Sequence, residues 1–426
     1  MLKYQMKLQK IISRLQQKHP KKIDLTLQRT INLLKKLGNP QDKLKNVISI
    51  VGTNSKYSIC QSLKSILNEE GHKCNLYLSP HLQSYNERFV YNNKEIDDQT
   101  LIDLLEETEK ILGDDQATLF EILTCAYLKY SEEFKDNITL IEAGLFHQFD
   151  STNVFKKNLA SIIGSIGLDH LQWLQNKTIE GIIHEKTVNL LKSNIFINKQ
   201  SKNEIMLKID KSLKKNKSNK YFYGKDFNIL KAENSFIQYE DKFGSIVLPE
   251  PNVLGDHQLT NISTSIAAAR HLFNIKNQSI KMGITKIVLK GRLQEINYGK
   301  LKDLIGSNRL FCDGGHNINA AKVIAKWIKQ QGKEVHLIVG MMKDKDHKGF
   351  IKCFTDNVKS ITLIDIPNQE GSISKEKLKV KLNGIHKKIN LSNNIEESIK
   401  VIKKREDSLC LIIGSLYLVG EVLNLN

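Results

Sequence analysis

The stretch that decides the fold of this chain is ISIVGTNSKYS, residues 48–58. A run rich in β-branched residues is followed by a short polar turn and then by the start of a helix. A strand, a turn and a helix N-terminus in this order form an anion site, because unpaired N–H groups and the positive end of the helix dipole point the same way. Lys56 adds a positive charge for terminal phosphates, and the hydroxyl of Ser58 can ligate Mg²⁺.

This stretch predicts a nucleotide phosphate site, although it does not match a phosphate loop in full. The strict spacing places glycine at positions 50 and 55, where this chain has Ile50 and Ser55. An ordinary strand-to-helix turn is therefore the alternative, and the residues downstream decide between the two.

The composition is that of a globular enzyme. Of the 426 residues, 40% are hydrophobic and 26% are charged, and no apolar run approaches the ~18 residues that a membrane span needs. Residues 1–21 form a Lys- and Gln-rich amphipathic pattern without the apolar core of a signal peptide. We therefore expect a surface helix there, no membrane partner and a cytoplasmic location.

Charge and cysteine content argue against other classes of protein. The net charge of +18 suggests a nucleic-acid binder, but only seven of the 64 basic residues are arginine, so we expect a lysine-rich solvated surface and no nucleic-acid partner. Such a positive field favours polyanionic substrates. The six cysteines are scattered singly without a CxxC pair, which argues against a zinc cluster or a disulfide framework. Most of them should be small core residues.

Strands and helices alternate along the chain and predict an α/β fold. In the first part, strands are predicted at 48–51, 75–79, 138–144, 160–170 and 195–197, helices at 25–38, 98–112, 116–134 and 258–273, and a small β excursion at 227–248. Four further strands, separated by helices, are predicted at 309–313, 334–341, 360–366 and 408–414. We expect a mostly parallel sheet domain with the phosphate loop at 1–286, followed by a smaller Rossmann-like α/β domain at 287–426.

Polar side chains follow four predicted strands of the first domain: Lys56, Ser79, Glu142 and His170. Ligands of a doubly wound sheet bind outside the carboxyl ends of its strands, so these side chains are expected at one ligand-binding edge. A buried Glu142 needs a cation, and Mg²⁺ held by Ser58, Glu142 and His170 would supply one. A salt-bridged Glu142 and a hydrogen-bonding His170 are the alternatives, because histidine is an unusual Mg²⁺ ligand.

The second domain contains a polar glycine turn after an apolar strand, LFCDGGHN at residues 310–317. The functional interpretation is an Asp313 and His316 pair that faces a ligand, and the alternative is a turn in which Asn317 caps the next helix. Arg292, directly after a glycine, either reaches phosphates or lies exposed to solvent.

With these pieces placed, the chain resembles the folylpolyglutamate synthase/dihydrofolate synthase family, a branch of the Mur-ligase-like ATP-dependent amide ligases, over about residues 25–425. The ordered motifs that carry the resemblance are LGNP (37–40), GTN (52–54), YLSPHL (77–82), NER (86–88), FE (120–121), DSTNV (150–154), IGLDH (166–170), EK (185–186), LGDHQ (254–258), GRLQ (291–294), DGGHN (313–317) and GSLYL (414–418). No single motif is decisive, but the ordered set is highly specific.

The resemblance implies an ATP-dependent ligase that joins L-glutamate to dihydropteroate, to the γ-carboxylate of folates, or to both. ATP would phosphorylate the acceptor carboxylate, and the amino group of glutamate would then attack the acyl phosphate. The implied cofactors are ATP and Mg²⁺, with a monovalent cation left open. The implied partners are these small molecules alone, and we expect a monomer.

The resemblance also assigns roles to residues. The implied nucleotide-binding residues are Gly52, Thr53, Asn54, Ser55, Lys56, Ser58, Asn261, Arg292 and Asp313. The implied metal ligands are Ser58, Glu142 and His170, and the implied catalytic residues are Lys56, Lys186 and His316. The pterin pocket would be lined by Ser79, His81, Glu121, Thr124, Asp150 and Asn153, and the incoming glutamate would be positioned by Asp313, His316 and Ser415. The family carbamylates the lysine that Lys186 matches, and an exposed helix lysine is the alternative.

The chain also departs from the family at glycine positions. It has Ser55 and Tyr57 where the family has glycine, and the family's Gly-Leu-Gly-Gly-Arg has become residues 144–148, GLFHQ. A left-handed backbone at position 55 would cost serine about 1–2 kcal/mol. Two alternatives to the folate ligase follow: a Mur ligase that takes a UDP-muramoyl acceptor, and a catalytically impaired homologue that binds folate or nucleotide.

Overall fold

The computed structural model describes residues 2–20, 25–231, 237–403 and 407–426. The chain divides into two compact units, each described here by itself. The first comprises Met1–Gly167, Leu171–Asn252 and Leu259–Ile287, and the second comprises Leu168–His170, Val253–Gln258 and Val288–Asn426. The sequence did not indicate that two short segments from the first part group with the second unit. The functional assignment of the two predicted domains stays a prediction.

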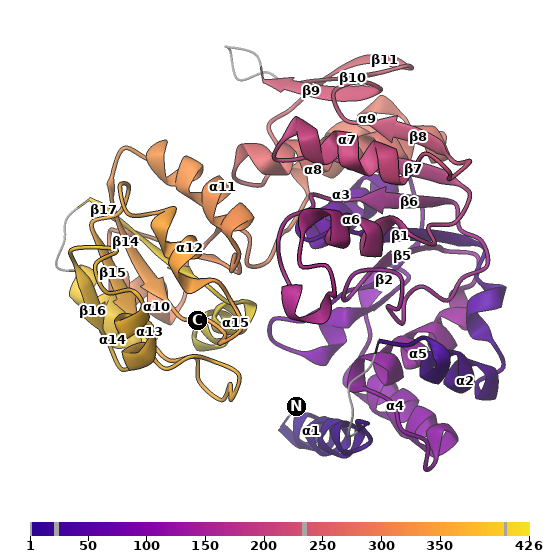
Figure 1. Cartoon of the computed structure of the whole chain (residues 1–426), viewed down its shortest axis with the longest axis horizontal. Helices are drawn as coiled ribbons and strands as arrows, with labels where there is room; N and C mark the ends of the chain where they lie inside the picture. Colours follow the sequence, from indigo (N-terminus) through magenta and orange to yellow (C-terminus); the bar gives the residue numbers. More distant parts are fainter. Residues whose placement is uncertain (1, 21–24, 232–236, 404–406) are drawn as a thin grey trace. The chain divides into compact units, whose positions relative to one another are not determined.

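The first unit is built on an eight-stranded sheet in the order β4-β3-β2-β5-β1-β6-β7-β8 (Figure 1). Six neighbouring strands are parallel, namely β2 (Cys74–Tyr77), β5 (Ile138–Glu142), β1 (Asn46–Val51), β6 (Ala160–Ile163), β7 (Asn194–Ile197) and β8 (Asn219–Phe222). At one edge, β3 (Phe89–Tyr91) and β4 (Lys94–Glu95) run antiparallel. The central strands β5 and β6 are buried along their whole length, as in sheets covered on both faces. The predicted α/β fold is confirmed.

The helices of the first unit occupy the connections between these strands and the segments before and after them. They are α1 (Leu2–Gln17), α2 (Gln28–Lys36), α3 (Lys56–Glu69), α4 (Asp98–Leu112), α5 (Leu119–Ser131), α6 (Ile179–Thr187), α7 (Asn203–Ser212), α8 (Asp256–Leu272) and α9 (Asn277–Thr285). Single 3-10 turns lie at Pro40–Lys43, Tyr85–Arg88, Glu132–Phe134 and Leu171–Trp173. A capping box starts α5, in which the hydroxyl of Thr118 accepts from the Glu121 amide and the Glu121 carboxylate accepts from the Thr118 amide.

Helix α1 is amphipathic, as the sequence predicts, and its apolar face belongs to a core that it shares with α2, α4 and α5. Leu8, Ile11, Ile12 and Leu15 are all buried in this cluster. On the polar side, Arg14 forms a two-bond ion pair with Glu109 of α4. One face of the predicted surface helix is therefore part of the core. Burial of its four apolar side chains stabilises the unit by several kcal/mol, at about 1.5–3 kcal/mol for each large apolar side chain.

A separate three-stranded antiparallel sheet consists of β9 (Phe227–Lys231), β10 (Ile237–Asp241) and β11 (Gly244–Leu248). It confirms the predicted β excursion at 227–248. Arg270 of α8 joins it through an ion pair of 3.2 Å to Asp241, and both side chains are buried.

The second unit contains a six-stranded sheet in the order β12-β13-β17-β14-β15-β16. Its strands are β12 (Gln294–Glu295), β13 (Arg309–Asp313), β14 (Glu334–Val339), β15 (Ser360–Leu363), β16 (Ile389–Leu391) and β17 (Ser408–Ile413), all parallel except β12. Its helices are α10 (Lys300–Ile305), α11 (Ile318–Lys329), α12 (His347–Lys352), α13 (Lys375–Lys381), α14 (Ile395–Lys403) and α15 (Leu416–Leu425). The four strands predicted for this part are confirmed, whereas the short edge strands β12 and β16 were missed.

One predicted strand is shorter in the structure. The pattern at 160–170 predicts a long strand, but β6 ends at Ile163. The chain then turns away from the sheet, because the Ile166 amide donates to the side chain of Gln200 and the Gly167 amide to the side chain of Thr53. The apolar sequence continues beyond the end of β6 because the side chain of Ile166 is buried in the core of the unit, although its backbone belongs to the loop.

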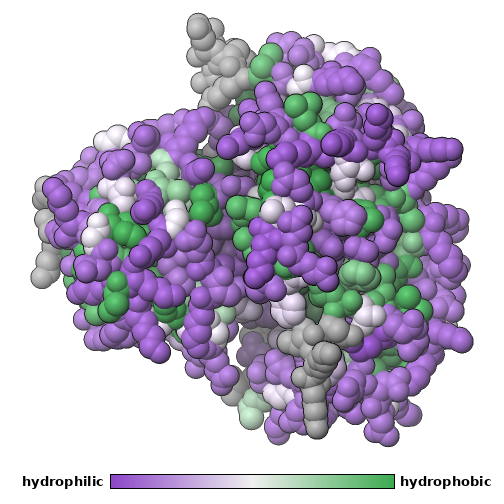
Figure 2. Space-filling model, viewed as in Figure 1, coloured by the Kyte–Doolittle hydropathy of each residue, from purple (hydrophilic) through white to green (hydrophobic). Residues whose placement is uncertain are grey.

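The surface agrees with the lysine-rich composition. Figure 2 shows one face of the molecule on which hydrophilic residues predominate and apolar ones form small separate areas. Within the described residues, no helix is both long and apolar enough to cross a bilayer. All six cysteines are free thiols and five of them are buried, which confirms their interpretation as core residues.

Candidate active site

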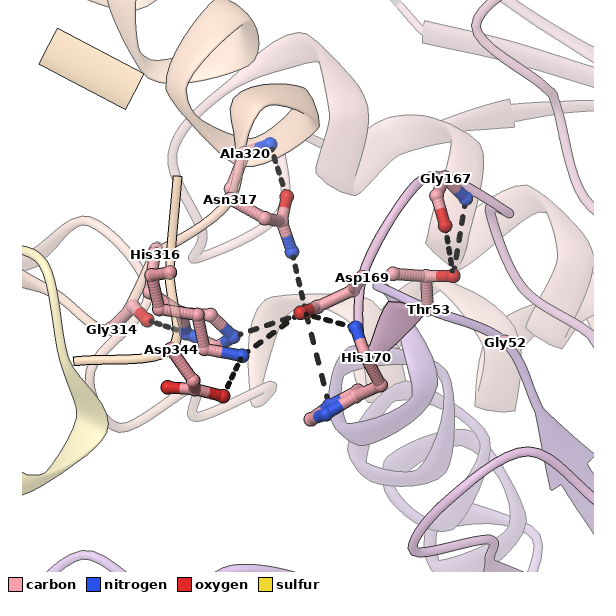
Figure 3. Close-up of polar contacts among 12 residues, drawn as sticks. Gly52, Thr53, Gly167, Asp169, His170, Gly314, His316, Asn317, Ala320 and Asp344 are labelled. Carbon is pink, nitrogen blue, oxygen red and sulfur yellow. Dashed lines mark hydrogen bonds and ion pairs between the residues drawn. The ribbon is translucent and has the colours of Figure 1, made fainter. Parts of the chain in front are cut away.

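The loop between β1 and α3 is compact and is held against the segment that follows β6. Gly52 has φ +153°, and a Cβ there would lie 3.0 Å from the Asn54 carbonyl oxygen and 3.1 Å from Gly164 Cα. The amides of Thr53 and Asn54 donate to the Ser165 carbonyl oxygen at 2.9 and 3.1 Å. The Thr53 hydroxyl donates to the carbonyl of Gly167 and accepts from its amide (Figure 3). These contacts fix the loop against the first turn of α3, whose amides have no partner within the helix. The binding of phosphate by this turn stays a prediction.

Position 55 does require a left-handed backbone, because Ser55 has φ +75°. An L-residue in this conformation costs about 1–2 kcal/mol relative to glycine. Ser55 recovers part of this cost through a hydrogen bond of 3.3 Å between its hydroxyl and that of Ser165. Tyr57 lies half-buried in the first turn of α3. The loop therefore keeps the geometry that glycine would favour, although it lacks glycine.

Two lysine ammonium groups meet at the carbonyl oxygen of Gly52. Lys56 donates to this oxygen at 3.3 Å, and Lys186 of α6 donates to it at 2.8 Å. Lys186 is only 5% exposed, so the interpretation as an exposed helix lysine is wrong. The carboxylate of Glu142 lies 3.9 Å from the Lys56 ammonium and also accepts from the Ser79 amide at 3.2 Å.

The side chains of Ser58 and Glu142 suit a hard divalent cation. Both are buried, with Ser58 in the first turn of α3 and Glu142 at the end of β5, beside Ile50 of β1. Their oxygens are the ligand type that Mg²⁺ prefers, and Glu142 already faces a positive charge. Within the described residues, no group of three or more His, Cys, Asp or Glu side chains is placed to hold a metal by itself. A Mg²⁺ at this position would therefore rely on phosphate and water oxygens as well.

His170 differs from the other three strand-end residues. It has φ +55° and belongs to the short segment that groups with the second unit. Its Nε2 lies 3.9 Å from the carboxylate of Asp169. Its predicted role as a metal ligand stays a prediction.

Asp169 is the centre of a polar cluster in the second unit (Figure 3). Its carboxylate receives the Lys345 ammonium at 2.8 Å, the His316 ring at 3.4 Å and the Asn317 side-chain amide at 3.4 Å. Burial alone would raise the pKa of Asp169, but the hydrogen bond from His316 and the nearby positive charges hold it well below its usual range. Asp169 is therefore ionised and orients the imidazole of His316, whose Nδ1 contacts the Gly314 carbonyl.

Asp313 is held by backbone amides at the end of β13. Its two oxygens accept from the amides of Leu293 and Gly315, both at 2.7 Å. Burial raises the pKa of Asp313, although the charge of Arg292 and the amide hydrogen bonds act in the opposite direction. The two residues that the sequence assigns to one ligand, Asp313 and His316, are thus brought onto one glycine turn. Asn317 also caps α11 by accepting from the Ala320 amide, so the structural interpretation of this residue is confirmed.

Two further predicted site residues have local partners. Ser415 caps α15, because its hydroxyl accepts from the Tyr417 amide at 3.1 Å. Asn261 of α8 is buried in the first unit and accepts from the side-chain amide of Asn198 at 2.7 Å. Roles of Ser415 toward glutamate and of Asn261 toward nucleotide stay predictions.

The predicted pterin residues lie in the first unit and form two groups. The Thr124 hydroxyl contacts the hydroxyls of Tyr77 and Ser151 at 3.1 and 2.9 Å. Ser151 directly follows Asp150 in the sequence. Asp150 accepts from the amides of Leu145 and Thr152 at 2.6 and 3.0 Å, and burial raises its pKa.

The other group is engaged in structural contacts. Glu121 forms a bidentate ion pair with Arg29 of α2, with a shortest distance of 2.9 Å. His81 accepts from Arg88 Nε at 2.9 Å, and burial followed by the charge of Arg88 lowers the pKa of His81 to about 3. Asn153 donates to the Gln148 carbonyl at 3.3 Å. Whether these side chains also contact a pterin stays a prediction.

The loop at 144–150 replaces the family's glycines with a packed aromatic ring. Phe146 has φ +58°, is 4% exposed and belongs to an apolar cluster with Val51, Ile163 and Ile182. The Lys186 ammonium lies 5.4 Å from the centre of its ring. His147 is buried beside it, and burial together with the Lys186 charge lowers its pKa to about 4.

Sequence reasoning missed Asp169, Lys345 and Phe146 as site residues. Asp169 lies within the IGLDH motif, and its place directly before His170 was the available signal. Lys345 is separated from Asp169 by 176 positions, so no local pattern could pair them. Phe146 is recognisable only as a departure from glycine, and the departure itself does not reveal that its ring faces a lysine.

Comparisons with known proteins find similar chains. A family model described as "Dihydrofolate synthetase, C-terminal domain" matches residues 294–425. The dihydrofolate synthase/folylpolyglutamate synthase of Bacillus subtilis is 27% identical over 93% of this chain and 94% of its own length. The protein of the same name from Escherichia coli is 27% identical over 97% and 94%.

Solved structures agree as well. The Escherichia coli FolC structure in complex with DHPP and ADP has a TM-score of 0.84 at 25% identity, over 97% of this chain and 96% of its own. A Mycobacterium tuberculosis folylpolyglutamate synthase complexed with ADP has a TM-score of 0.87 at 20% identity, over 99% and 98%, and supports the fold. By its ordered motifs and these likenesses, the chain is similar over nearly its whole length to proteins named dihydrofolate synthase/folylpolyglutamate synthase.

Proposed function

We propose that this chain is an ATP-dependent ligase that joins L-glutamate to dihydropteroate, and to the γ-carboxylate of folates, through an acyl phosphate. The observation that carries this proposal is the meeting of the Lys56 and Lys186 ammonium groups at one carbonyl oxygen beside Glu142. The names of the relatives and the ADP complex of FolC support the same reaction class.

The reaction needs activation because a carboxylate is a poor acyl donor. Transfer of the terminal phosphoryl group of ATP to a carboxylate oxygen releases ADP and creates a phosphate leaving group. The amine of glutamate then attacks the acyl carbon, phosphate departs and the amide nitrogen loses a proton. Positioning and electrostatic stabilisation supply most of the catalysis of phosphoryl transfer.

The first unit provides the charges for phosphoryl transfer. Lys56 and Lys186 would neutralise the terminal phosphates, and the first turn of α3 would receive them on its amides. Ser58 and Glu142, joined by His170, would hold Mg²⁺, which supplies charge to the transferring phosphoryl group when bound. The fixed loop geometry at Gly52 keeps these groups in place without reorganisation.

The acceptor would be recognised in the first unit as well. His81 accepts through Nδ1 from Arg88, so its other nitrogen carries the hydrogen and can donate to a heterocycle. Thr124 and the neighbouring hydroxyls offer further polar contacts. Ser79, Asp150, Asn153 and Glu121 complete the proposed pocket, the last through its pair with Arg29.

The second unit would handle the incoming glutamate and part of the nucleotide. Asp313 and the ring of His316, which Asp169 orients, are the polar groups proposed to bind the amine of glutamate. Ser415 is proposed to help position the same glutamate. Arg292, whose charge acts on Asp313, is proposed for the nucleotide together with Asn261. We further propose that the protein works as a cytoplasmic monomer without a nucleic-acid partner.

The test is release of phosphate from ATP that depends on both dihydropteroate and glutamate. A dependence on both, with product mass equal to dihydrofolate, supports the proposal. A UDP-muramoyl acceptor in the same assay identifies the Mur-type alternative if it replaces dihydropteroate. Calorimetric binding of folate and nucleotide without any turnover identifies the impaired homologue and overturns the proposal.

A further inference from the structure

Two buried side-chain amides, those of Asn198 and Gln200, follow directly after β7, and neither lies in a motif that carries the family resemblance. Asn198 is 1% exposed and Gln200 is 7% exposed. Because β7 is parallel to β6 and β1, both amides lie beyond the same ends of the strands as the phosphate loop. A polar side chain is costly to bury unless it is hydrogen-bonded, so the partners of these two amides show what their burial achieves.

Gln200 holds the turn that follows β6. Its Oε1 accepts from the Ile166 amide at 2.8 Å, and its Nε2 donates to the Gly164 carbonyl oxygen at 3.2 Å. The same Nε2 donates to the Asn198 carbonyl oxygen at 2.8 Å. One side chain therefore spans the turn from its first residue to its third and joins it to the end of β7.

The turn that Gln200 holds supports the phosphate loop. The Ser165 carbonyl oxygen accepts from the amides of Thr53 and Asn54 at 2.9 and 3.1 Å. A Cβ at Gly164 would lie 2.7 Å from the Asn54 carbonyl oxygen, so the two backbones are in direct contact. The Ser165 carbonyl reaches both amides only while the turn keeps its shape, and Gln200 bonds the backbone on each side of Ser165.

Asn198 holds Asn261 of α8, a residue predicted to contact the nucleotide. Its Nδ2 donates to Asn261 Oδ1 at 2.7 Å, which sets the orientation of the Asn261 amide. Its own Oδ1 accepts from the Thr264 hydroxyl at 3.0 Å and from the Lys199 amide at 2.8 Å. An oxygen that accepts from two donors determines which end of the Asn198 amide faces Asn261.

We propose that Gln200 and Asn198 are positioning residues for the nucleotide, Gln200 through the phosphate loop and Asn198 through Asn261. This proposal rests on the proposed ATP-dependent function, because it takes the predicted nucleotide contacts of the loop and of Asn261 as given. In this proposal neither side chain touches the nucleotide, and each restricts the freedom of a group that does. A group that is held in place before binding does not have to be ordered by the ligand, so affinity increases without any further contact.

Gln200→Met tests the first half of the proposal on the full-length protein. It keeps the length of the side chain but removes its three hydrogen bonds. The expected result is roughly tenfold weaker binding of a non-hydrolysable ATP analogue with Mg²⁺ in calorimetry, the equivalent of one to two hydrogen bonds. In steady-state kinetics KM for ATP should rise by a similar factor, whereas KM for glutamate should not change. Unchanged affinity for the analogue in the folded variant overturns the role of Gln200.

Asn198→Asp and Asn198→Leu test the second half. The first keeps the oxygen that accepts from Thr264 and Lys199 but replaces the donor to Asn261 by an acceptor. The second removes the same donor without adding a charge. Both should bind the ATP analogue roughly tenfold more weakly, because the Asn261 amide loses the bond that orients it. A loss in Asn198→Asp alone would be due to charge repulsion and overturns the role of Asn198.

Asn75 provides the matched control. It is a buried amide of the same sheet whose Nδ2 donates to the Phe134 carbonyl oxygen at 3.2 Å, but it lies near the amino end of β2. Asn75→Leu should lower the free energy of unfolding and leave the affinity for the ATP analogue unchanged. Equal losses of affinity in Asn75→Leu and Gln200→Met overturn the proposal, because any buried hydrogen bond of the sheet would then have this effect.

Hydrogen exchange of the wild-type protein tests the proposal without any variant, and it decides the matter if a variant does not fold. The phosphate loop and the turn are expected to open as one hydrogen-bonded unit. Binding of the ATP analogue should therefore slow exchange at residues 164–167 as well as at residues 52–58. Protection that is confined to residues 52–58 overturns the proposal.

This inference and the ligase proposal can fail separately. A wild-type protein that binds the analogue and loses affinity in Gln200→Met, but forms no amide product, overturns the ligase proposal alone. A wild-type protein that forms the product and is unaffected by Gln200→Met overturns this inference alone. A wild-type protein that binds no nucleotide overturns both.

Discussion

Two loops of the first unit lack glycines that the family pattern contains, and the side chains at those positions make different contacts. At the phosphate loop, Ser55 keeps φ +75° and its hydroxyl pairs with Ser165. At the loop after β5, Phe146 keeps φ +58°, but its ring fills the core and faces Lys186. Both loops thus have a left-handed backbone at a residue other than glycine. The Ser55 side chain makes a polar contact, whereas the Phe146 side chain packs in the core.

The largest effect is expected from replacement of Lys56, the cation of the phosphate loop. Lys56→Ala should lower glutamate-dependent phosphate release by about a hundredfold or more, because it removes a charge that stabilises the transferring phosphoryl group. Steady-state kinetics on the folded variant measure this loss. Lys64→Ala, two turns further along α3, is the control and should retain most activity. Similar losses in the two variants would contradict the assignment of Lys56.

The loop after β5 should make the unit sensitive to acid, whereas the phosphate loop contains no histidine. The pKa of His147 is lowered by burial and by Lys186 to about 4. Unfolded histidine has a pKa near 6.5, so the unfolded state binds the proton first and stability rises with pH between the two values. About 3 kcal/mol should be fully present above pH 6.5 and lost as the pH falls to 4.

Urea unfolding at several pH values measures this effect of His147. In His147→Gln the rise in the free energy of unfolding between pH 4 and 6.5 should become shallower by that amount. An unchanged slope would place the acid sensitivity elsewhere.

Replacement of Phe146 should separate backbone strain from packing. Phe146→Gly removes the ring at a cost of about 3–5 kcal/mol, and relief of the left-handed strain returns about 1–2 kcal/mol. Phe146→Ala loses the ring but keeps the strain. We therefore expect Gly to be more stable than Ala at this position, the reverse of the order in a helix or strand, and chemical denaturation measures both. Alanine as the more stable variant would argue against strain at Phe146.

The smallest effect is expected at Ser55. Ser55→Gly relieves the left-handed strain but loses the bond to Ser165 and gains freedom in the unfolded chain, so stability should change by about 1 kcal/mol or less. Ser55→Ala keeps the strain and loses the bond, and should be less stable than both. If alanine and serine are equally stable in thermal unfolding, the hydroxyl contact contributes nothing.

The sequence predicted those features of the site that depend on strand order. Lys56, Ser79 and Glu142 follow neighbouring parallel strands, so their common edge is a consequence of the α/β pattern. The left-handed backbone at position 55 was also anticipated as the condition under which serine is costly. These features need only local pattern and topology.

The remaining features depend on packing between segments far apart in the chain. The burial of Lys186 follows from its contact with Gly52, 134 positions earlier. The pairing of Glu121 with Arg29 gives this predicted pocket residue a contact between two helices that the sequence did not reveal. Side-chain direction at these positions is set by the fold as a whole, and no periodicity in the sequence encodes it.

Helix α1 precedes the first of the motifs that carry the family resemblance, LGNP at residues 37–40. It contributes Leu8, Ile11, Ile12 and Leu15 to the cluster that also contains side chains of α4 and α5. In a shortened chain that starts at residue 25, the apolar side chains of α4 and α5 that pack against α1 would be exposed to solvent. Such a truncated chain is expected to aggregate during expression, because it lacks the part of the core that α1 supplies.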